Sequence, residues 1–183
     1  CAEFGDMVAY QVFNETDSGF GDDAGNANES AIGIPPHHYA AMLDSAAAAI
    51  RAAHPGASVI LGGMKTGPDN AINYIKQVQQ ALNGRLPVDA LAYHPYGRFV
   101  HTPIFNFGTI GTLADALNRF QRAFPQQPLW ITEVGAAADH PIGPDHYADI
   151  ATYLREVVDE VADNFAGLVP VLIWFGWTDL MRN

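Results

Sequence analysis

Five short runs of apolar residues recur along the chain, and each run is apolar at nearly every position. Strands that are buried on both faces of a parallel sheet have this pattern, whereas strands with one wet face alternate between apolar and polar residues. The predicted strands are Met7–Phe13, Ser58–Leu61, Val88–Tyr93, Leu129–Thr132 and Val169–Phe175.

Between consecutive runs lie four segments whose apolar residues recur at the three- and four-residue spacing of one helix face. Residues that end helices follow three of these segments: Pro55 lies just beyond the first, Gly84 beyond the second and Pro125 beyond the third. The predicted helices are Tyr39–Ala53, Ala71–Leu82, Leu113–Phe124 and Tyr147–Asn164.

Strict alternation of strands and helices predicts an α/β fold whose sheet is parallel and whose crossovers are right-handed. No linker divides the chain, so residues 1–183 are expected to form one domain. An open doubly wound sheet and part of a TIM barrel both fit, and periodicity alone does not choose between them. In the barrel alternative the strands form one curved sheet in the order of the sequence, without an internal reversal.

The charge balance excludes some classes of partner. Acidic residues outnumber basic ones by 20 to 9, which gives a formal net charge of −11. No stripe of Lys and Arg is present to neutralise phosphates, so neither nucleic acid nor a membrane surface is an expected partner. No apolar run reaches membrane-spanning length, and no secretory signal precedes the first predicted strand. The sequence leaves the compartment open between secreted and cytoplasmic.

Sequence signals for cofactors and metals are weak. Gly62-Gly63 follows a predicted strand, but neither a dinucleotide fingerprint nor a phosphate loop continues it, and the chain has no Gly-x-Ser-x-Gly elbow. The histidines lack the regular spacing of a metal site, so no cofactor and no metal are expected. The acidic stretch 17–23 lacks EF-hand spacing and is expected to form a solvated loop. With a single cysteine, Cys1, no internal disulfide is expected.

Two glutamates each end an apolar predicted strand, Glu15 after the first and Glu133 after the fourth. The carboxyl ends of parallel strands share the rim at which α/β folds bind ligands. Taken singly, such a glutamate is more often a salt-bridge or capping partner. Two carboxyl groups facing one cavity are what glycosidic bond cleavage needs, because one is protonated to assist the leaving oxygen and the other is charged at the anomeric carbon.

The motifs around these glutamates resemble those of clan A glycoside hydrolases, which are (β/α)8 barrels. In that clan the acid/base glutamate follows an asparagine at the end of the fourth strand, and the nucleophilic glutamate ends the seventh. Asn14-Glu15 matches the first pattern, and Ile-Thr-Glu-Val-Gly at 131–135 matches the second. The resemblance spans Met7–Asp179 and implies a partial TIM (β/α)8 barrel of about five parallel strands with alternating helices, from strand four to strand eight. It further implies a retaining glycoside hydrolase with Glu15 as acid/base and Glu133 as nucleophile.

The same resemblance implies roles for further residues. Asn14 would hydrogen-bond the sugar 2-hydroxyl, while His94 and Tyr96 would line the subsite at the cleaved bond, with Tyr96 the better candidate to hold Glu133. Trp174 would be the sugar-stacking platform, with Trp177 as the other possibility. The competing readings are a core aromatic for Trp174 and a satisfied loop histidine for His94. Retention implies that the two carboxyl groups lie about 5–5.5 Å apart.

Other functions remain open on the sequence alone. A partial barrel exposes two sheet edges, which predicts a homo-oligomer that covers them. The expected partner is otherwise an oligo- or polysaccharide substrate. One alternative is a non-catalytic half-barrel that binds carbohydrate or self-assembles, and a weaker one is an open α/β ligand-binding domain unrelated to glycosidases.

Overall fold

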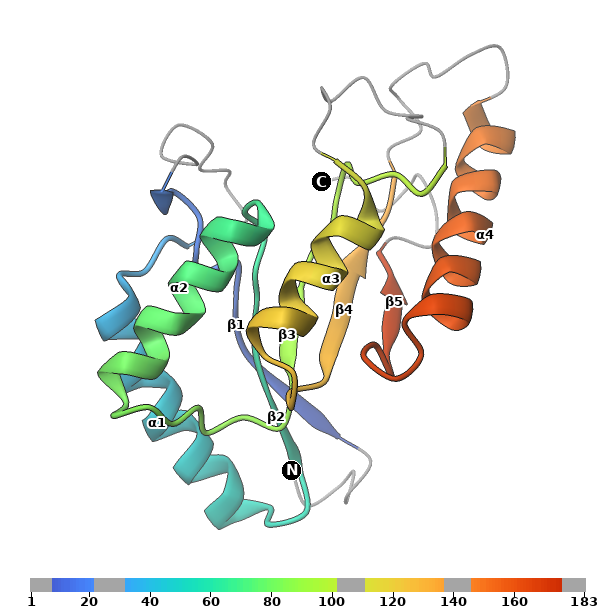
Figure 1. The fold of residues 1–183 in the computed structure, drawn as a ribbon. Coiled ribbons are helices and arrows are strands. Elements are labelled where there is room, and N and C mark those ends of the chain that lie inside the picture. The colour runs from blue at the N-terminus through green and yellow to red at the C-terminus, as the bar shows by residue number, and fades with distance from the viewer. Residues whose placement is uncertain (1–7, 22–31, 102–110, 137–145, 176–183) are drawn as a thin grey trace. The chain divides into compact units, whose positions relative to one another are not determined.

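A computed structural model of the chain describes residues 8–21, 32–101, 111–136 and 146–175 (Figure 1). Strands and helices alternate in the predicted order. The strands are β1 (Ala9–Asn14), β2 (Ser58–Gly63), β3 (Leu91–Tyr93), β4 (Leu129–Val134) and β5 (Leu172–Trp174). The helices are α1 (Pro36–Ala53), α2 (Pro68–Ala81), α3 (Leu113–Ala123) and α4 (His146–Asn164). No helix within the described ranges combines the length and apolarity that crossing a membrane requires.

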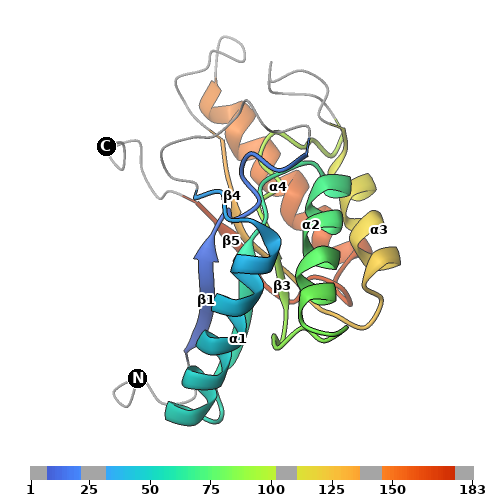
Figure 2. The same cartoon turned by 90° about the vertical axis from the view of Figure 1, so that its left-hand side faces the viewer.

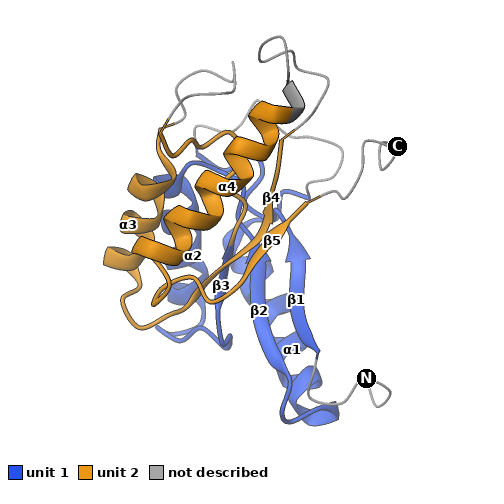
Figure 3. Ribbon diagram, turned by 90° about the vertical axis from the view of Figure 1, so that its right-hand side faces the viewer, with its two compact units in different colours: residues 1–92 blue, residues 93–183 orange. Residues whose placement is uncertain are grey.

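The chain divides into two compact units, residues 1–92 and residues 93–183 (Figure 3). The expectation of one domain over residues 1–183 stays a prediction. In the first unit β1 and β2 pair in parallel, from Ala9 opposite Ser58 to Asn14 opposite Gly63. Helices α1 and α2 pack against each other on one side of these strands (Figure 2). The largest buried side chains of this unit include Tyr39, Leu43, Ile60, Leu61, Tyr74 and Ile75.

Both helices of the first unit begin three residues earlier than the apolar spacing predicts. Each starts at a proline, Pro36 in α1 and Pro68 in α2. Proline suits the first turn of a helix, because the amide that it lacks has no acceptor inside the helix there. The prolines therefore mark the starts of these helices, which the spacing of apolar residues does not show.

The remaining strands follow the order β3, β4, β5 in one sheet, with β3 at the boundary between the two units, and β4 and β5 of the second unit pair in parallel. Figure 3 shows α3 and α4 on the same side of β4 and β5. Helix α3 begins as a capped helix, since Thr112 Oγ1 accepts a hydrogen bond from the Asp115 amide at 3.1 Å. The buried side chains that join these helices to the strands include Leu113, Leu117, Phe120, Ile131, Tyr153 and Val157.

Strand β5 is shorter than the predicted Val169–Phe175. The amide of Val169 donates to Phe165 O at 2.8 Å, so this residue still belongs to the turn that follows α4. The next residue, Pro170, has no amide to give to a neighbouring strand. An apolar run therefore overstates the strand wherever its first residues close the preceding helix.

Candidate active site

Glu15 follows β1 in a backbone conformation that non-glycine residues seldom adopt. Its φ is +49°, and that of Phe13, two residues earlier, is +68°. The Glu15 amide still donates to Gly63 O at 2.9 Å, and the side chain is only 5% exposed. Left-handed conformations cost about 1–2 kcal/mol per residue and persist where the surroundings hold them, often at functional sites. The end of β1 is therefore a fixed feature of the first unit.

A tyrosine that the sequence did not single out joins β1 to β2 just before Glu15. The Tyr39 hydroxyl of α1 donates to Val12 O at 2.9 Å and accepts from the Gly62 amide at 2.8 Å. Burial raises the pKa of Tyr39, so the hydroxyl keeps its proton and serves as donor and acceptor together. A Cβ on Gly62 would lie 2.8 Å from Val12 O, so only glycine fits beside this bridge.

The loop after Glu15 differs from the expected solvated loop at Asp17, whose side chain is 0% exposed. One Asp17 oxygen accepts from the Lys65 amide at 3.0 Å, and the other accepts from the amide and hydroxyl of Thr66. Burial raises the pKa of Asp17, while these hydrogen bonds lower it by a smaller amount. The prediction of a solvated loop was wrong at Asp17, because its carboxylate accepts hydrogen bonds from backbone amides that follow β2. A sequence pattern does not reveal such contacts.

Asn14 is the last residue of β1. Its Oδ1 atom is buried and has no hydrogen-bond partner among the described residues. Buried polar atoms without partners are rare in folded proteins, so such an atom marks a place where a bound hydroxyl or water is accommodated. The observation is compatible with the predicted sugar contact, which stays a prediction.

In the second unit, Glu133 lies near the end of β4 and is held by a tyrosine. The Tyr96 hydroxyl donates to Glu133 Oε2 at 3.0 Å, as the sequence led us to expect. The hydrogen bond fixes the orientation of this carboxylate.

His94, also predicted as a site residue, lies buried beside the same carboxylate. Its Nδ1 atom is 3.7 Å from Glu133 Oε2, and its Nε2 atom is 3.0 Å from the hydroxyl oxygen of Thr132. The pairing of β4 with β5 is irregular at these residues. Three steps along β4, from Ile131 to Val134, match only two steps along β5, which interrupts the regular alternation of side chains.

The aromatic residues at the end of β5 have different surroundings. Trp174 is half-buried, with its ring 6.1 Å from that of Tyr153, while Trp177 lies outside the described residues. Phe175, which the sequence did not single out, is 59% exposed and lies edge-on to Tyr96 at 6.3 Å. An exposed aromatic ring beside Tyr96 is a candidate platform for a sugar. The sequence did not identify Phe175 as a candidate, because this residue continues the apolar run of the last predicted strand.

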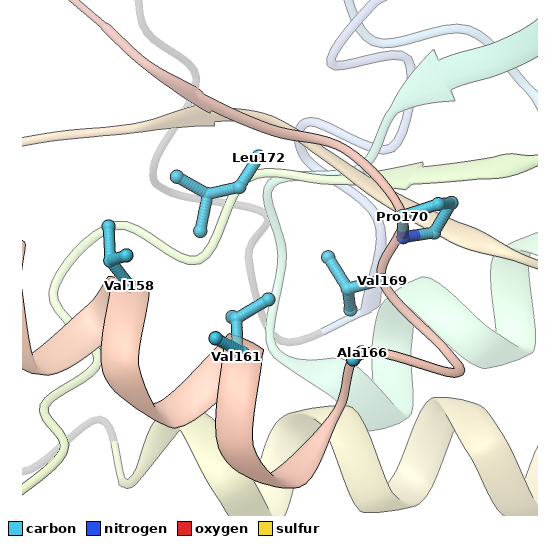
Figure 4. Close-up of a pocket in the computed structure, with 7 residues that line it drawn as sticks. Val158, Val161, Ala166, Val169, Pro170 and Leu172 are labelled. Carbon is cyan, nitrogen blue, oxygen red and sulfur yellow. The ribbon is translucent and has the colours of Figure 1, made fainter.

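The second unit also contains an apolar cavity of about 410 Å³ between α4 and the segment that leads into β5 (Figure 4). A sugar site needs polar groups to orient hydroxyls. The lining offers none, since it consists of Val158, Val161, Ala162, Ala166, Val169, Pro170 and Leu172. We therefore place the candidate chemistry at the strand ends.

The described geometry assembles the predicted residues in two groups. Asn14 and Glu15 belong to the first unit, whereas His94, Tyr96, Glu133 and Trp174 belong to the second. Contacts among Tyr96, His94 and Glu133 are described within the second unit. The separation of the two carboxyl groups, about 5–5.5 Å for a retaining pair, stays a prediction.

Comparison with known proteins points to one class. Residues 11–183 match the protein family described as the glycosyl hydrolase catalytic core. A search of curated proteins gave no match.

Solved structures with a similar fold are glycoside hydrolases. A GH128 (subgroup II) endo-β-1,3-glucanase from Pseudomonas viridiflava superposes with a TM-score of 0.64 at 19% identity, over 94% of this chain and 60% of that one. A GH128 (subgroup VI) exo-β-1,3-glucanase from Aureobasidium namibiae superposes with a TM-score of 0.60 at 18% identity, over 96% of this chain and 66% of that one. AbfB, a family 51 α-L-arabinofuranosidase from Bifidobacterium longum, superposes with a TM-score of 0.56 at 16% identity, over 90% of this chain and 37% of that one.

These likenesses show the fold, a partial (β/α)8 barrel, and confirm the predicted fold class. The chain spans only 60% and 66% of the two glucanases.

Proposed function

The chain belongs to the glycosyl hydrolase catalytic core family, and from this premise we propose that it cleaves O-glycosidic bonds with retention, through Glu133 as nucleophile and Glu15 as acid/base. The observation that carries the proposal is the hydrogen bond from the Tyr96 hydroxyl to Glu133 Oε2 at 3.0 Å. This hydrogen bond fixes the orientation of the carboxylate, which attack on an anomeric carbon requires.

The reaction has two steps. In the first, a carboxylate oxygen of Glu133 bonds to the anomeric carbon while the bond to the leaving oxygen breaks, and Glu15 gives that oxygen its proton. In the second, Glu15 takes a proton from water, whose oxygen bonds to the anomeric carbon as the bond to Glu133 breaks. Glu15 ends protonated and Glu133 charged, as at the start. Glu15 is buried at the end of β1, where its backbone conformation fixes the start of its side chain.

Binding of the sugar is assigned to polar and aromatic groups at the strand ends. We assign the 2-hydroxyl to Asn14, whose buried Oδ1 has no partner among the described residues. Trp174 remains the proposed stacking platform and Trp177 the second candidate, and Phe175 joins them because its ring is exposed. Two similar structures are β-1,3-glucanases, so oligosaccharides of β-1,3-linked glucose are the first substrates to test.

Azide rescue tests the two roles separately. On an aryl glycoside with a good leaving group, Glu133→Ala should lose turnover, because no glycosyl-enzyme forms. Glu15→Ala should still form that intermediate, since such a leaving group needs little acid assistance. Azide should then accelerate Glu15→Ala and give a glycosyl azide of retained configuration. Complete loss in both variants, without rescue, would refute the assignment.

We also propose that the chain self-associates through its sheet edges. In the three-stranded sheet β5 follows β4 at one edge, and its residue Ile173 is 48% exposed. Exposed apolar edge strands favour association, and a charge placed on them opposes it. Sedimentation should show a dimer that Ile173→Lys weakens. A stable monomer at tens of micromolar would contradict this proposal.

A further inference from the structure

The two ring nitrogens of His94 face two consecutive residues of β4. Nε2 lies 3.0 Å from Thr132 Oγ1, and Nδ1 lies 3.7 Å from Glu133 Oε2. On a regular strand these neighbours would point to opposite faces. The register shift between Ile131 and Val134 interrupts this alternation, and both residues lie within reach of one ring. The sequence therefore folds so that the residue before the proposed nucleophile contacts the histidine beside it.

The charge of Glu133 selects between the two ways of placing one proton on this ring. A proton on Nε2 would leave the lone pair of Nδ1 facing a carboxylate oxygen, which is electrostatically unfavourable. A proton on Nδ1 faces Glu133 Oε2, and the lone pair of Nε2 then accepts from Thr132. A threonine hydroxyl rotates freely enough to donate in that direction.

We propose that Thr132 is a positioning residue, whose hydroxyl donates to His94 Nε2 and so holds the ring as the tautomer with its proton on Nδ1, facing Glu133. The hydrogen bond made by one imidazole nitrogen determines which nitrogen carries the proton. The 3.7 Å contact with Glu133 is longer than a hydrogen bond, and such contacts tighten when substrate binds. This inference rests on the proposed role of Glu133.

The inference also identifies the attacking atom. The Tyr96 hydroxyl donates to Glu133 Oε2, the oxygen that the Nδ1–H of His94 faces. Both donors therefore stabilise charge on Oε2, and Oε1 is the oxygen that bonds to the anomeric carbon. The role of His94 is then to act through Glu133, in addition to any contact with the sugar.

The nitrogen-15 NMR spectrum of the His94 ring tests the tautomer directly in the full chain. A protonated and an unprotonated ring nitrogen resonate far apart, and His94→Asn identifies the signals of this ring among the seven histidines. In the wild type the Nδ1 signal should be that of a protonated nitrogen and the Nε2 signal that of an unprotonated one. Thr132→Val, which has the same shape without the hydroxyl, should move the proton to Nε2 or mix the two tautomers. Thr132→Ser keeps the hydroxyl and should preserve the wild-type spectrum.

Turnover of an activated aryl glycoside provides a second readout. Thr132→Val should lower kcat/KM about tenfold, the factor that corresponds to one ordinary hydrogen bond, and Thr132→Ser should restore most of it. A wild-type ring protonated on Nε2 or on both nitrogens would overturn the inference. So would an unchanged tautomer in Thr132→Val. The expected spectra in a chain without any glycosidase activity would instead overturn the proposed function, because the tautomer is measured without turnover.

Discussion

Tyr39→Phe removes a single oxygen atom from the place where β1 and β2 are joined. That oxygen donates to Val12 O at 2.9 Å and accepts from the Gly62 amide at 2.8 Å, and the tyrosine is fully buried. The substitution therefore takes the partner from a buried carbonyl and from a buried amide at once. The two left-handed residues, Phe13 and Glu15, follow directly.

The cost can be worked from these two contacts. A buried polar group left without its partner costs about 1–3 kcal/mol. Two such groups, with some relaxation of the backbone, give a loss of about 2–4 kcal/mol in the free energy of unfolding. For a chain of this length each kcal/mol lowers Tm by roughly 2–4 °C. Tyr153→Phe is the matched control, because that buried hydroxyl donates to one backbone carbonyl, Arg98 O, at 2.8 Å.

Urea unfolding followed by circular dichroism measures both variants under the same conditions. Tyr39→Phe should cost more than Tyr153→Phe, because its hydroxyl serves a backbone carbonyl and a backbone amide of two strands. An equal or smaller cost would contradict the reasoning, because it would mean that Val12 and Gly62 close into a direct ladder bond once the hydroxyl is gone. The Tyr39 hydroxyl would then contribute little to the stability of the end of β1.

Three further perturbations follow from contacts in the structure. Burial raises the pKa of Asp17 above 3.8 in the folded chain, so its contribution to stability falls as pH rises through that folded pKa. Urea unfolding between about pH 4 and 7 tests this: the free energy of unfolding should fall less with rising pH in Asp17→Asn than in the wild type. Parallel plots of this free energy against pH for the two proteins would contradict the prediction. Thr112→Ala removes the cap of α3 and should cost about 1 kcal/mol in thermal unfolding, whereas Thr112→Ser should cost little. Tyr96→Phe should lower kcat on an activated aryl glycoside about 10- to 100-fold, since a hydrogen bond to a charged group contributes about 1.5–3 kcal/mol; an unchanged kcat would show that Glu133 does not depend on it.

The sequence predicted, in order, the helices and strands that the structure describes, because doubly buried strands and amphipathic helices have distinct periods. The resemblance to clan A glycoside hydrolases also implied the Tyr96–Glu133 contact that the structure contains. Helix starts and the length of β5 were less accurate, since proline chemistry and turn hydrogen bonds determine them locally.

The supporting residues of the site could not be predicted in the same way. Tyr39 reads as one more apolar residue of an alanine-rich helix, and its importance comes from a hydroxyl that meets two backbone groups of other elements. Thr132 has the sequence pattern of an ordinary strand residue, and its contact with His94 lies where the pairing of β4 with β5 shifts register. Contacts of this kind depend on atomic positions across the fold, which residue periodicity does not encode.

Covalent trapping tests the central claim, that Glu133 is the nucleophile of a retaining glycosidase. A 2-deoxy-2-fluoro glucoside with a good leaving group slows the second step more than the first, so the glycosyl-enzyme accumulates and its attachment site can be read by peptide mass spectrometry. The account predicts one fluorosugar on the peptide that contains Glu133, and its loss when an acceptor restores turnover. A label on the peptide of Glu15, or hydrolysis with inverted product and no label, would contradict it.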